Sequence, residues 1–170
     1  MNGVVMDTVY KQRIEQLCVA LESDEYEQAR HALRRGGTYC CLGVACQIVD
    51  PTRWLAADAK RHDPVYWYVG AGVDVSQYDD LARDKDGNEP TGVSTYLPRD
   101  IMEWYGFAGV DPLVNCPCGC TSSKDKTPDL DCLMCYGEGT LKRGLSELND
   151  DFCWSFKKIA QALHLTYLTD

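Results

Sequence analysis

The segment from Tyr39 to Val49 constrains the fold most, because it is apolar almost all the way around a helix. Thr38 can cap its start, and Asp50 before Pro51 marks its end, since the residue before a proline disfavours the helical conformation. A helix without a polar face has to be buried on every side. We therefore expect a central helix around which the rest of the chain packs.

Two helices are expected before this central one. Four apolar residues at the spacing of one helical face predict a first helix from about Thr8 to Leu21: Ile14, Leu17, Cys18 and Leu21. Ser23 and Asp24 offer cap oxygens for a second helix, Glu25 to Arg35, which Gly36 and Gly37 would end. The two would form a helical hairpin.

The chain changes character after Pro64, where β-branched and aromatic residues dominate. Val65 to Val69 is expected to be a strand, and Val73 to Val75 a short extended piece. The turn signal Asp86-Gly87 then leads to a further strand from Val93 to Leu97. These segments predict a short antiparallel sheet of two or three strands.

Helical signals return towards the end of the chain. Pro98 suits the first turn of a short helix from Arg99 to Tyr105. A closing helix, capped by Ser155 or Asp150, should run to Leu163 or Leu168 because four apolar residues share its face: Phe156, Ile159, Ala160 and Leu163. The expected fold is α+β, a small helical domain with a short antiparallel sheet in a single domain over residues 1–170.

Five of the ten cysteines fall within one short window: Cys116, Cys118, Cys120, Cys132 and Cys135. Zinc prefers four thiolate or imidazole ligands in a tetrahedron, and a Cys-x-x-Cys turn supplies two of them. Residues 112–141 therefore read as an inserted cysteine-rich zinc knuckle module with a structural zinc, in which one of the five sulfurs is spare. An iron–sulfur cluster, disulfides and free thiols are the alternatives.

The run Cys132-Leu-Met-Cys-Tyr-Gly-Glu-Gly139 resembles the Cys-x-x-Cys-x-Gly-x-Gly element in the zinc region of DnaJ-type chaperones. That family uses four such elements for two zinc ions, whereas this chain has one complete copy. The resemblance implies zinc binding at these residues and does not carry over chaperone activity.

The charge balance limits the classes of partner. With 17 Lys and Arg against 26 Asp and Glu, the formal net charge is −9, which disfavours direct binding to a nucleic-acid backbone. The acids are spread among basic residues, so solubility is favoured over imitation of DNA. The N-terminus lacks a signal-peptide pattern and no apolar run approaches the ~18 residues of a membrane span, so a cytoplasmic protein without a membrane is expected.

Tyr39-Cys-Cys-Leu-Gly places Cys40 and Cys41 near an expected helix N-terminus, where a thiol pKa can fall. A cysteine-dependent enzyme would pair one of them with His62 or His164, with Asn149 or Asp150 orienting the histidine. The simpler interpretation makes both thiols small hydrophobic side chains of a buried helix. We assign no catalytic residue and favour a protein that is not an enzyme.

Four segments resemble a family of small proteins encoded by phages and prophages: Glu25-Tyr-Glu-Gln-Ala-Arg30, Tyr39-Cys-Cys-Leu-Gly-Val-Ala-Cys46, Tyr96-Leu-Pro98 with Trp104, and Leu145-Ser-Glu-Leu-Asn-Asp150 with Ser155-Phe156. The similarity spans roughly residues 8–110 and 143–165, and shorter members lack the cysteine-rich insertion. It implies an accessory protein acting inside a bacterial host cell.

Three functions follow as hypotheses. The first is a non-catalytic accessory module that binds a host or phage protein. The second is a protein that binds or sequesters a small molecule between the central helix and the aromatic hairpin, with Asn149 and Asp150 as polar contacts. The third is a hydrolase or transferase that uses Cys40 or Cys41.

Overall fold

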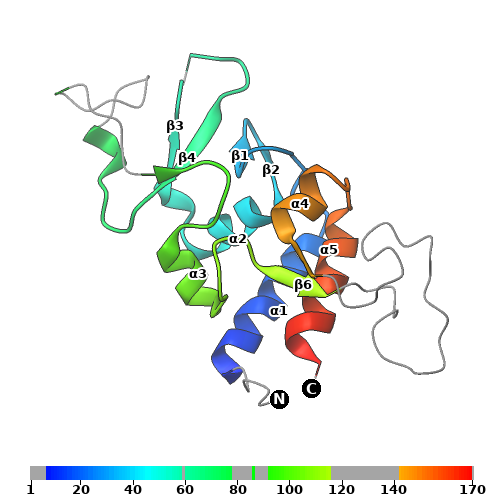
Figure 1. Ribbon diagram of the computed structural model, residues 1–170. Helices are drawn as coiled ribbons and strands as arrows, with labels where there is room; N and C mark the ends of the chain where they lie inside the picture. Colours follow the sequence, from blue (N-terminus) through cyan, green and yellow to red (C-terminus); the bar gives the residue numbers. More distant parts are fainter. Residues whose placement is uncertain (1–6, 59, 78–85, 87–91, 116–141, 170) are drawn as a thin grey trace, which may run out of the picture.

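The computed structural model describes residues 7–58, 60–77, 86, 92–115 and 142–169, which form an α+β fold (Figure 1). The helices are α1 (Thr8–Glu22), α2 (Cys41–Val49), α3 (Arg99–Tyr105), α4 (Leu145–Asp150) and α5 (Phe156–Leu163), with the turns η1 (Pro51–Arg53), η2 (Val75–Gln77) and the π-helical η3 (His164–Leu168). The strands are β1 (Arg34–Arg35), β2 (Thr38–Tyr39), β3 (Trp54–Ala56), β4 (Val65–Val69), β5 (Gly92–Val93), β6 (Leu113–Asn115) and β7 (Lys142–Gly144). The predicted α+β class is confirmed.

Strand β4 is the centre of the larger sheet and is the strand predicted at Val65–Val69. The order is β2-β1-β4-β3, with β5 also paired to β4, and all these pairs are antiparallel. Tyr68 of β4 lies opposite Trp54 on one side and Val93 on the other. The sheet has five strands, more than the two or three expected, because two-residue strands carry too little pattern to be recognised.

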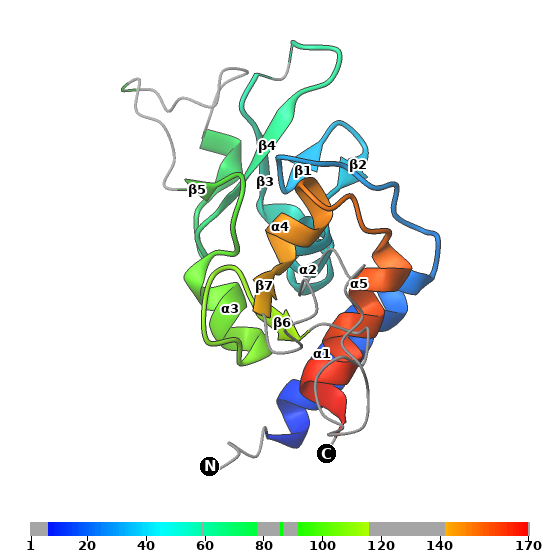
Figure 2. The same cartoon turned by 45° about the vertical axis from the view of Figure 1, so that its right-hand side comes forward.

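The apolar helix α2 lies at the centre of the molecule, between the sheet and the other helices (Figures 1 and 2). Its residues from Cys41 to Cys46 are all buried, so the central buried helix is confirmed. Cys40 rather than Thr38 caps it, with the sulfur accepting the Gly43 N–H at 3.4 Å. Gly43 is required by packing, because an added Cβ would overlap the Leu33 carbonyl oxygen.

Helices α1 and α5 run antiparallel and side by side in both views (Figures 1 and 2). The buried residues of α1 are the four predicted from spacing: Ile14, Leu17, Cys18 and Leu21. Asp7 caps α1 by accepting the Val9 N–H, and Ser155 caps α5 by accepting the Lys158 N–H. The chain continues from α5 into η3. Of the two predicted ends of the closing helix, Leu163 is the last residue of α5 and Leu168 is the last residue of η3.

The helix predicted from Glu25 to Arg35 is wrong. This stretch is irregular and ends in β1, and Gln28 forms a parallel bridge with Tyr39. The Ala29 N–H donates to the Tyr39 carbonyl at 2.7 Å, and the Tyr39 N–H donates to the Glu27 carbonyl at 2.9 Å. These long-range bonds replace the local ladder of a helix.

Two shorter predictions also need correction. The extended piece at Val73–Val75 is a turn leading into η2, because the Asp74 carboxylate accepts the backbone N–H and the hydroxyl of Ser76 at 2.9 and 2.6 Å. The strand expected from Val93 to Leu97 is limited to β5. Helix α4 had not been predicted as a separate helix.

Strands β6 and β7 form a separate antiparallel pair at the base of the predicted insertion. Asn115 lies opposite Lys142, so the chain leaves and returns at neighbouring positions. The residues between them, including all five predicted metal ligands from Cys116 to Cys135, lie outside the described residues.

Candidate functional site

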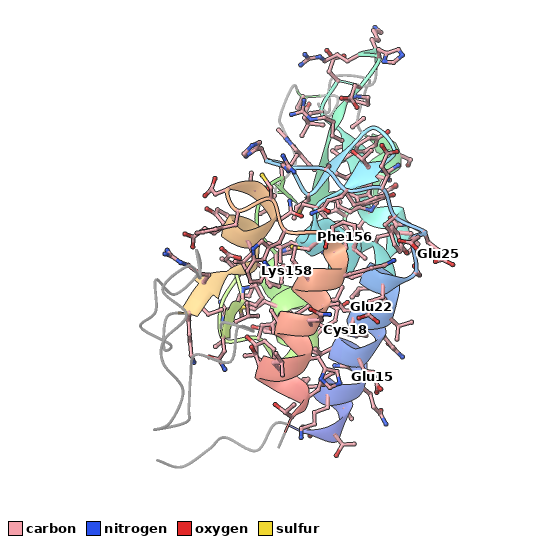
Figure 3. All side chains as sticks on the ribbon, turned by 90° about the vertical axis from the view of Figure 1, so that its right-hand side faces the viewer. Glu15, Cys18, Glu22, Glu25, Phe156 and Lys158 are labelled. Atoms are coloured by element: carbon pink, nitrogen blue, oxygen red, sulfur yellow. The ribbon has the colours of Figure 1, made fainter. Side chains whose placement is uncertain are left out.

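Helix α1 carries a second stripe beside its buried face. Glu15, Val19 and Glu22 recur at i, i+4 and i+7, a spacing that places them on one side of a helix. All three are exposed, and Val19 keeps 62% of its surface accessible. Figure 3 shows Glu15 and Glu22 on α1 on either side of Cys18, and the exposed Val19 lies between the two glutamates in sequence.

The facing stripe comes from the end of α5 and from η3, through Gln161, His164 and Leu165. Leu165 is 46% exposed. The π-helical turn is held by Thr166, whose hydroxyl donates to the Ala162 carbonyl at 2.7 Å and accepts the Asn115 N–H at 2.9 Å. Such π-helical segments occur frequently at functional sites.

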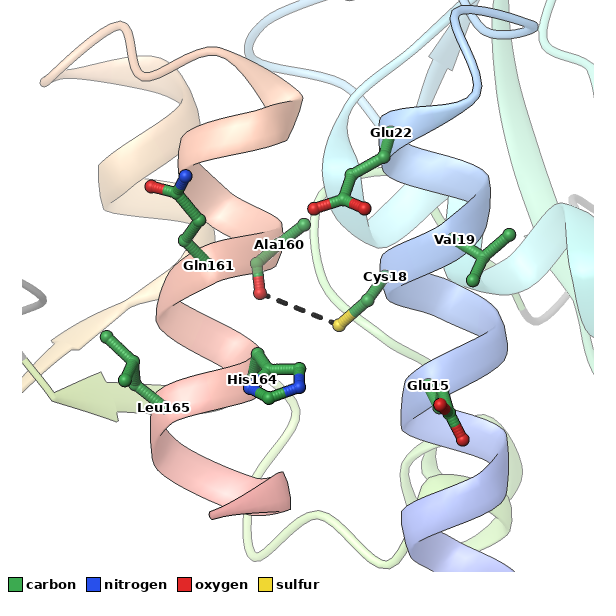
Figure 4. A pocket seen from close by; sticks show the side chains of 8 residues that line it. All are labelled: Glu15, Cys18, Val19, Glu22, Ala160, Gln161, His164 and Leu165. Carbon is green, nitrogen blue, oxygen red and sulfur yellow. Dashed lines mark hydrogen bonds between the residues drawn. The ribbon is translucent and has the colours of Figure 1, made fainter.

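Together the two stripes line a groove of about 490 Å³ that is open to solvent (Figure 4). Its floor is formed by Cys18 and Ala160, where the Cys18 thiol donates to the Ala160 carbonyl at 3.6 Å. Val19 and Leu165 stand on opposite walls. We call this feature the α1–α5 groove.

The α1 wall of the α1–α5 groove is acidic. Over the described part of the chain, no hydrogen bond or ion pair engages the carboxylate of Glu15 or Glu22. Burial, together with the nearby charges of Glu22 and Glu15, raises the pKa of the Cys18 thiol to about 12. The thiol in the floor is therefore protonated at neutral pH and is not an activated nucleophile.

One end of the α1–α5 groove is tied by an ion pair across the two helices. Lys157, at the start of α5, places its Nζ 3.2 Å from Oδ2 of Asp24, just after α1. Both side chains are exposed, so the pair contributes at most about 1 kcal/mol. The ion pair therefore matters mainly because it engages the positive charge of Lys157 next to the groove.

The cysteines proposed as nucleophiles are buried. Cys40 is 4% exposed and Cys41 is 1% exposed, and the Cys41 thiol donates to the Leu145 carbonyl at 3.5 Å. Burial raises the pKa of Cys40 to about 12 and that of Cys41 well above its usual value. His164 lines the α1–α5 groove instead. This geometry favours the interpretation of both thiols as hydrophobic core side chains.

Asn149 and Asp150, the predicted polar ligand contacts, lie together at the end of α4. Asn149 is fully buried, and its amide donates to the Ala29 carbonyl at 2.8 Å and to Oδ1 of Asp150 at 2.7 Å. Its Oδ1 accepts a bond from Gln28 at 2.8 Å. Both amide hydrogens are thus engaged inside the protein, and Asp150 also lies 3.7 Å from the exposed His31.

The aromatic side chains of the strands next to α2 pack around the guanidinium group of Arg34. The guanidinium carbon of Arg34 lies 4.0 Å from the ring centroid of Tyr66, 5.3 Å from Tyr39 and 5.7 Å from Trp54. The Trp54 indole donates to Gln47 at 2.8 Å. The region where a small-molecule pocket was expected is therefore occupied by contacts among the protein's own side chains.

Sequence reasoning missed the α1–α5 groove. The signal it offered was Val19, an apolar residue off the buried stripe and flanked by Glu15 and Glu22. Among the residues that the structure describes, no cluster of three or more His, Cys, Asp or Glu side chains is arranged to hold a metal ion. Nor does any helix in these ranges have the length and apolar character needed to cross a membrane.

Comparison with protein-family models gives a match over most of the chain. The family described as "Domain of unknown function (DUF8296)" matches residues 10–166. Comparison with curated proteins and with solved structures gives no match.

Proposed function

The chain belongs to the DUF8296 family, and from that premise we propose that it is a non-catalytic module that binds another protein through the α1–α5 groove. The setting we propose is a phage or prophage accessory protein whose partner is a host or phage protein in the cytoplasm of a bacterial cell. The resemblance of its Tyr39–Cys46 and Leu145–Asp150 segments to phage and prophage proteins supports this setting.

The observation that carries the proposal is that Val19 and Leu165 are exposed at the two outer edges of one open groove (Figure 4). Two antiparallel helices that lie side by side offer a groove into which a third helix or an extended segment packs. The groove offers apolar contact together with a protonated thiol in its floor. These features suit association better than acid–base or nucleophilic chemistry.

We further propose that a structural zinc ion is bound in the cysteine-rich segment. The support is the Cys-x-x-Cys spacing of Cys132 and Cys135 and the three further thiols at Cys116, Cys118 and Cys120. Native mass spectrometry of protein purified without added zinc should find one zinc ion per chain. The double variant Cys132→Ala with Cys135→Ala should lose it, and retention of the metal by that variant would contradict the assignment.

Small-molecule binding remains the second candidate because a volume of about 490 Å³ is within the range of ligand pockets. A retained metabolite would appear as an added mass in the same native spectrum. If that mass is lost from a Leu165→Asp variant, the groove holds a metabolite and the protein-binding proposal is wrong.

Site-specific photo-crosslinking tests the protein-binding proposal. A photoreactive amino acid at position 19 should yield a discrete crosslinked product in the cells in which the chain acts. The matched control is position 9, because Val9 lies on the same helix, is 46% exposed and is outside the groove lining.

The position-19 product should disappear when Leu165 on the opposite wall is changed to Asp. If positions 19 and 9 give the same products, or if position 19 gives none, the α1–α5 groove is not the binding surface.

A further inference from the structure

We infer that the occupant of the α1–α5 groove is a basic amphipathic helix of a partner protein, with two Lys or Arg residues seven positions apart and apolar residues between them. This inference rests on the proposed function and specifies its partner. It follows from the spacing of charges along α1 and from the sign of the charges around the groove.

The spacing of residues along the α1 wall defines the sequence pattern expected of the partner helix. Glu15 and Glu22 are seven residues apart, which is about 10 Å along a helix at 1.5 Å per residue. Val19 lies between them, four residues after one and three before the other. A helix lying along the groove repeats its own side chains every seven residues, so it can place a cation opposite each carboxylate and an apolar side chain opposite Val19.

Three cations near the groove have partners within the protein. Arg13 of α1 donates to the Trp104 carbonyl at 2.6 Å, on the side of α3. Lys158 of α5 lies with its Nζ 4.0 Å from the ring centroid of Trp154, and Lys157 is paired with Asp24. The carboxylates of Glu15 and Glu22 line the α1 side of the groove, and a basic partner complements them.

The same charges argue against the other occupants. In a symmetric dimer built on this groove, Glu15 and Glu22 of one copy would approach the same residues of the other, and each copy has a net charge of −9. An anionic membrane surface or a nucleic acid carries charge of the same sign as Glu15 and Glu22 on the α1 wall. A cationic helix is the class of partner that the groove attracts.

Binding of synthetic helical peptides to the full chain tests the inference. The probe is a peptide with Leu along one face and Lys at two positions seven residues apart, compared with the same peptide carrying Glu at those positions. The Lys peptide should bind, and the double variant Glu15→Gln with Glu22→Gln should weaken binding about 10-fold. The matched variant Glu25→Gln with Glu27→Gln makes the same charge change outside the groove and should weaken it no more than about 2-fold.

Charge reversal adds a gain of function. The variant Glu15→Lys with Glu22→Lys should prefer the Glu peptide over the Lys peptide, and circular dichroism should show that it is folded because both positions are exposed. Equal weakening by the two Gln pairs would mean general attraction to an acidic protein and would overturn the inference. Stronger binding of the Glu peptide to the unmodified chain would also overturn it.

The two proposals fail in different ways. If position 19 crosslinks a partner specifically but the Lys peptide does not bind, protein binding stands and the basic helix is wrong. If the unmodified chain dimerises through the groove, sedimentation equilibrium will show a mass that Val19→Asp halves and Val9→Asp leaves unchanged, and the inference again fails.

Discussion

The substitution Asn149→Ala separates a structural role for this residue from a role in ligand binding. Asn149 is fully buried at the end of α4, where its amide group joins the Ala29 carbonyl, Asp150 and Gln28. A residue whose donors are already bonded within the protein stabilises the fold. A ligand contact would instead be expected to leave a polar atom free for the ligand.

The expected loss in the free energy of unfolding depends on whether each hydrogen-bond partner of Asn149 finds a replacement bond in the Asn149→Ala variant. Gln28 keeps its second bond to the Trp154 carbonyl at 2.7 Å, and Asp150 has a 20% exposed side chain that can bind water. The Ala29 carbonyl belongs to a buried residue and loses a donor, which costs about 1 to 3 kcal/mol. The space left by the amide adds about 1 kcal/mol, so we expect a loss of about 2 to 4 kcal/mol.

Urea denaturation followed by circular dichroism measures this loss as a change in the free energy of unfolding. Gln12→Ala removes an exposed amide from α1 and should change that free energy by no more than about 0.5 kcal/mol. A double-mutant cycle of Gln28→Ala with Asn149→Ala should show a coupling of at least about 0.5 kcal/mol. If Asn149→Ala behaves like Gln12→Ala, the network does not stabilise the fold and our reasoning is wrong.

Three further predictions concern the core and the insertion. In urea denaturation, Gly43→Ala should lower the free energy of unfolding by about 1 to 3 kcal/mol despite a gain of ~1 kcal/mol in helix propensity, because the added Cβ meets a backbone carbonyl. Gly37→Ala, which has open space around its Cβ, should be neutral or slightly stabilising, and the opposite order of the two variants would refute the packing argument. The free energy of unfolding should fall as pH rises above about 9, because the thiols of Cys18 and Cys40 ionise in the unfolded chain from a pKa of 9.0 but stay protonated to about 12 in the folded one. In urea titrations, Cys18→Ala should make this fall with pH less steep, and an equally steep fall in the variant would contradict the prediction. Replacing residues 116–141 by Asn-Gly should preserve the far-ultraviolet circular dichroism of the rest of the chain, since a two-residue turn fits the β6–β7 register, and loss of cooperative melting would show that the segment is needed for folding.

The helices that the sequence predicted correctly are those with a strong local pattern. The spacing of Ile14 to Leu21 and the apolar run after Cys40 are visible without knowledge of any partner. The 25–35 segment failed because the bonds of Gln28 and Ala29 go to residues far along the chain, such as Asn149. Helix propensity carries no information about such partners.

The α1–α5 groove could not be predicted because its two walls are far apart in sequence. Its floor is joined by a bond between Cys18 and Ala160, which are 142 residues apart. Spacing showed that α1 has a buried face, and it left open which helix would lie beside Val19. The acidic α1 wall is recognisable as part of a site only when Leu165 is placed on the other side of the groove.

The pairing of α1 with α5 also sets the order of events while the chain is synthesised. The buried face of α1 leaves the ribosome well before its partner in α5, because Cys18 and Ala160 are 142 residues apart. Until then Leu17 and Leu21 have no α5 to pack against, and the Asn149 network cannot close on Ala29. Contacts of such long sequence separation slow folding and leave apolar surface exposed to other chains. The core around α1 is therefore completed only after α5 has been synthesised.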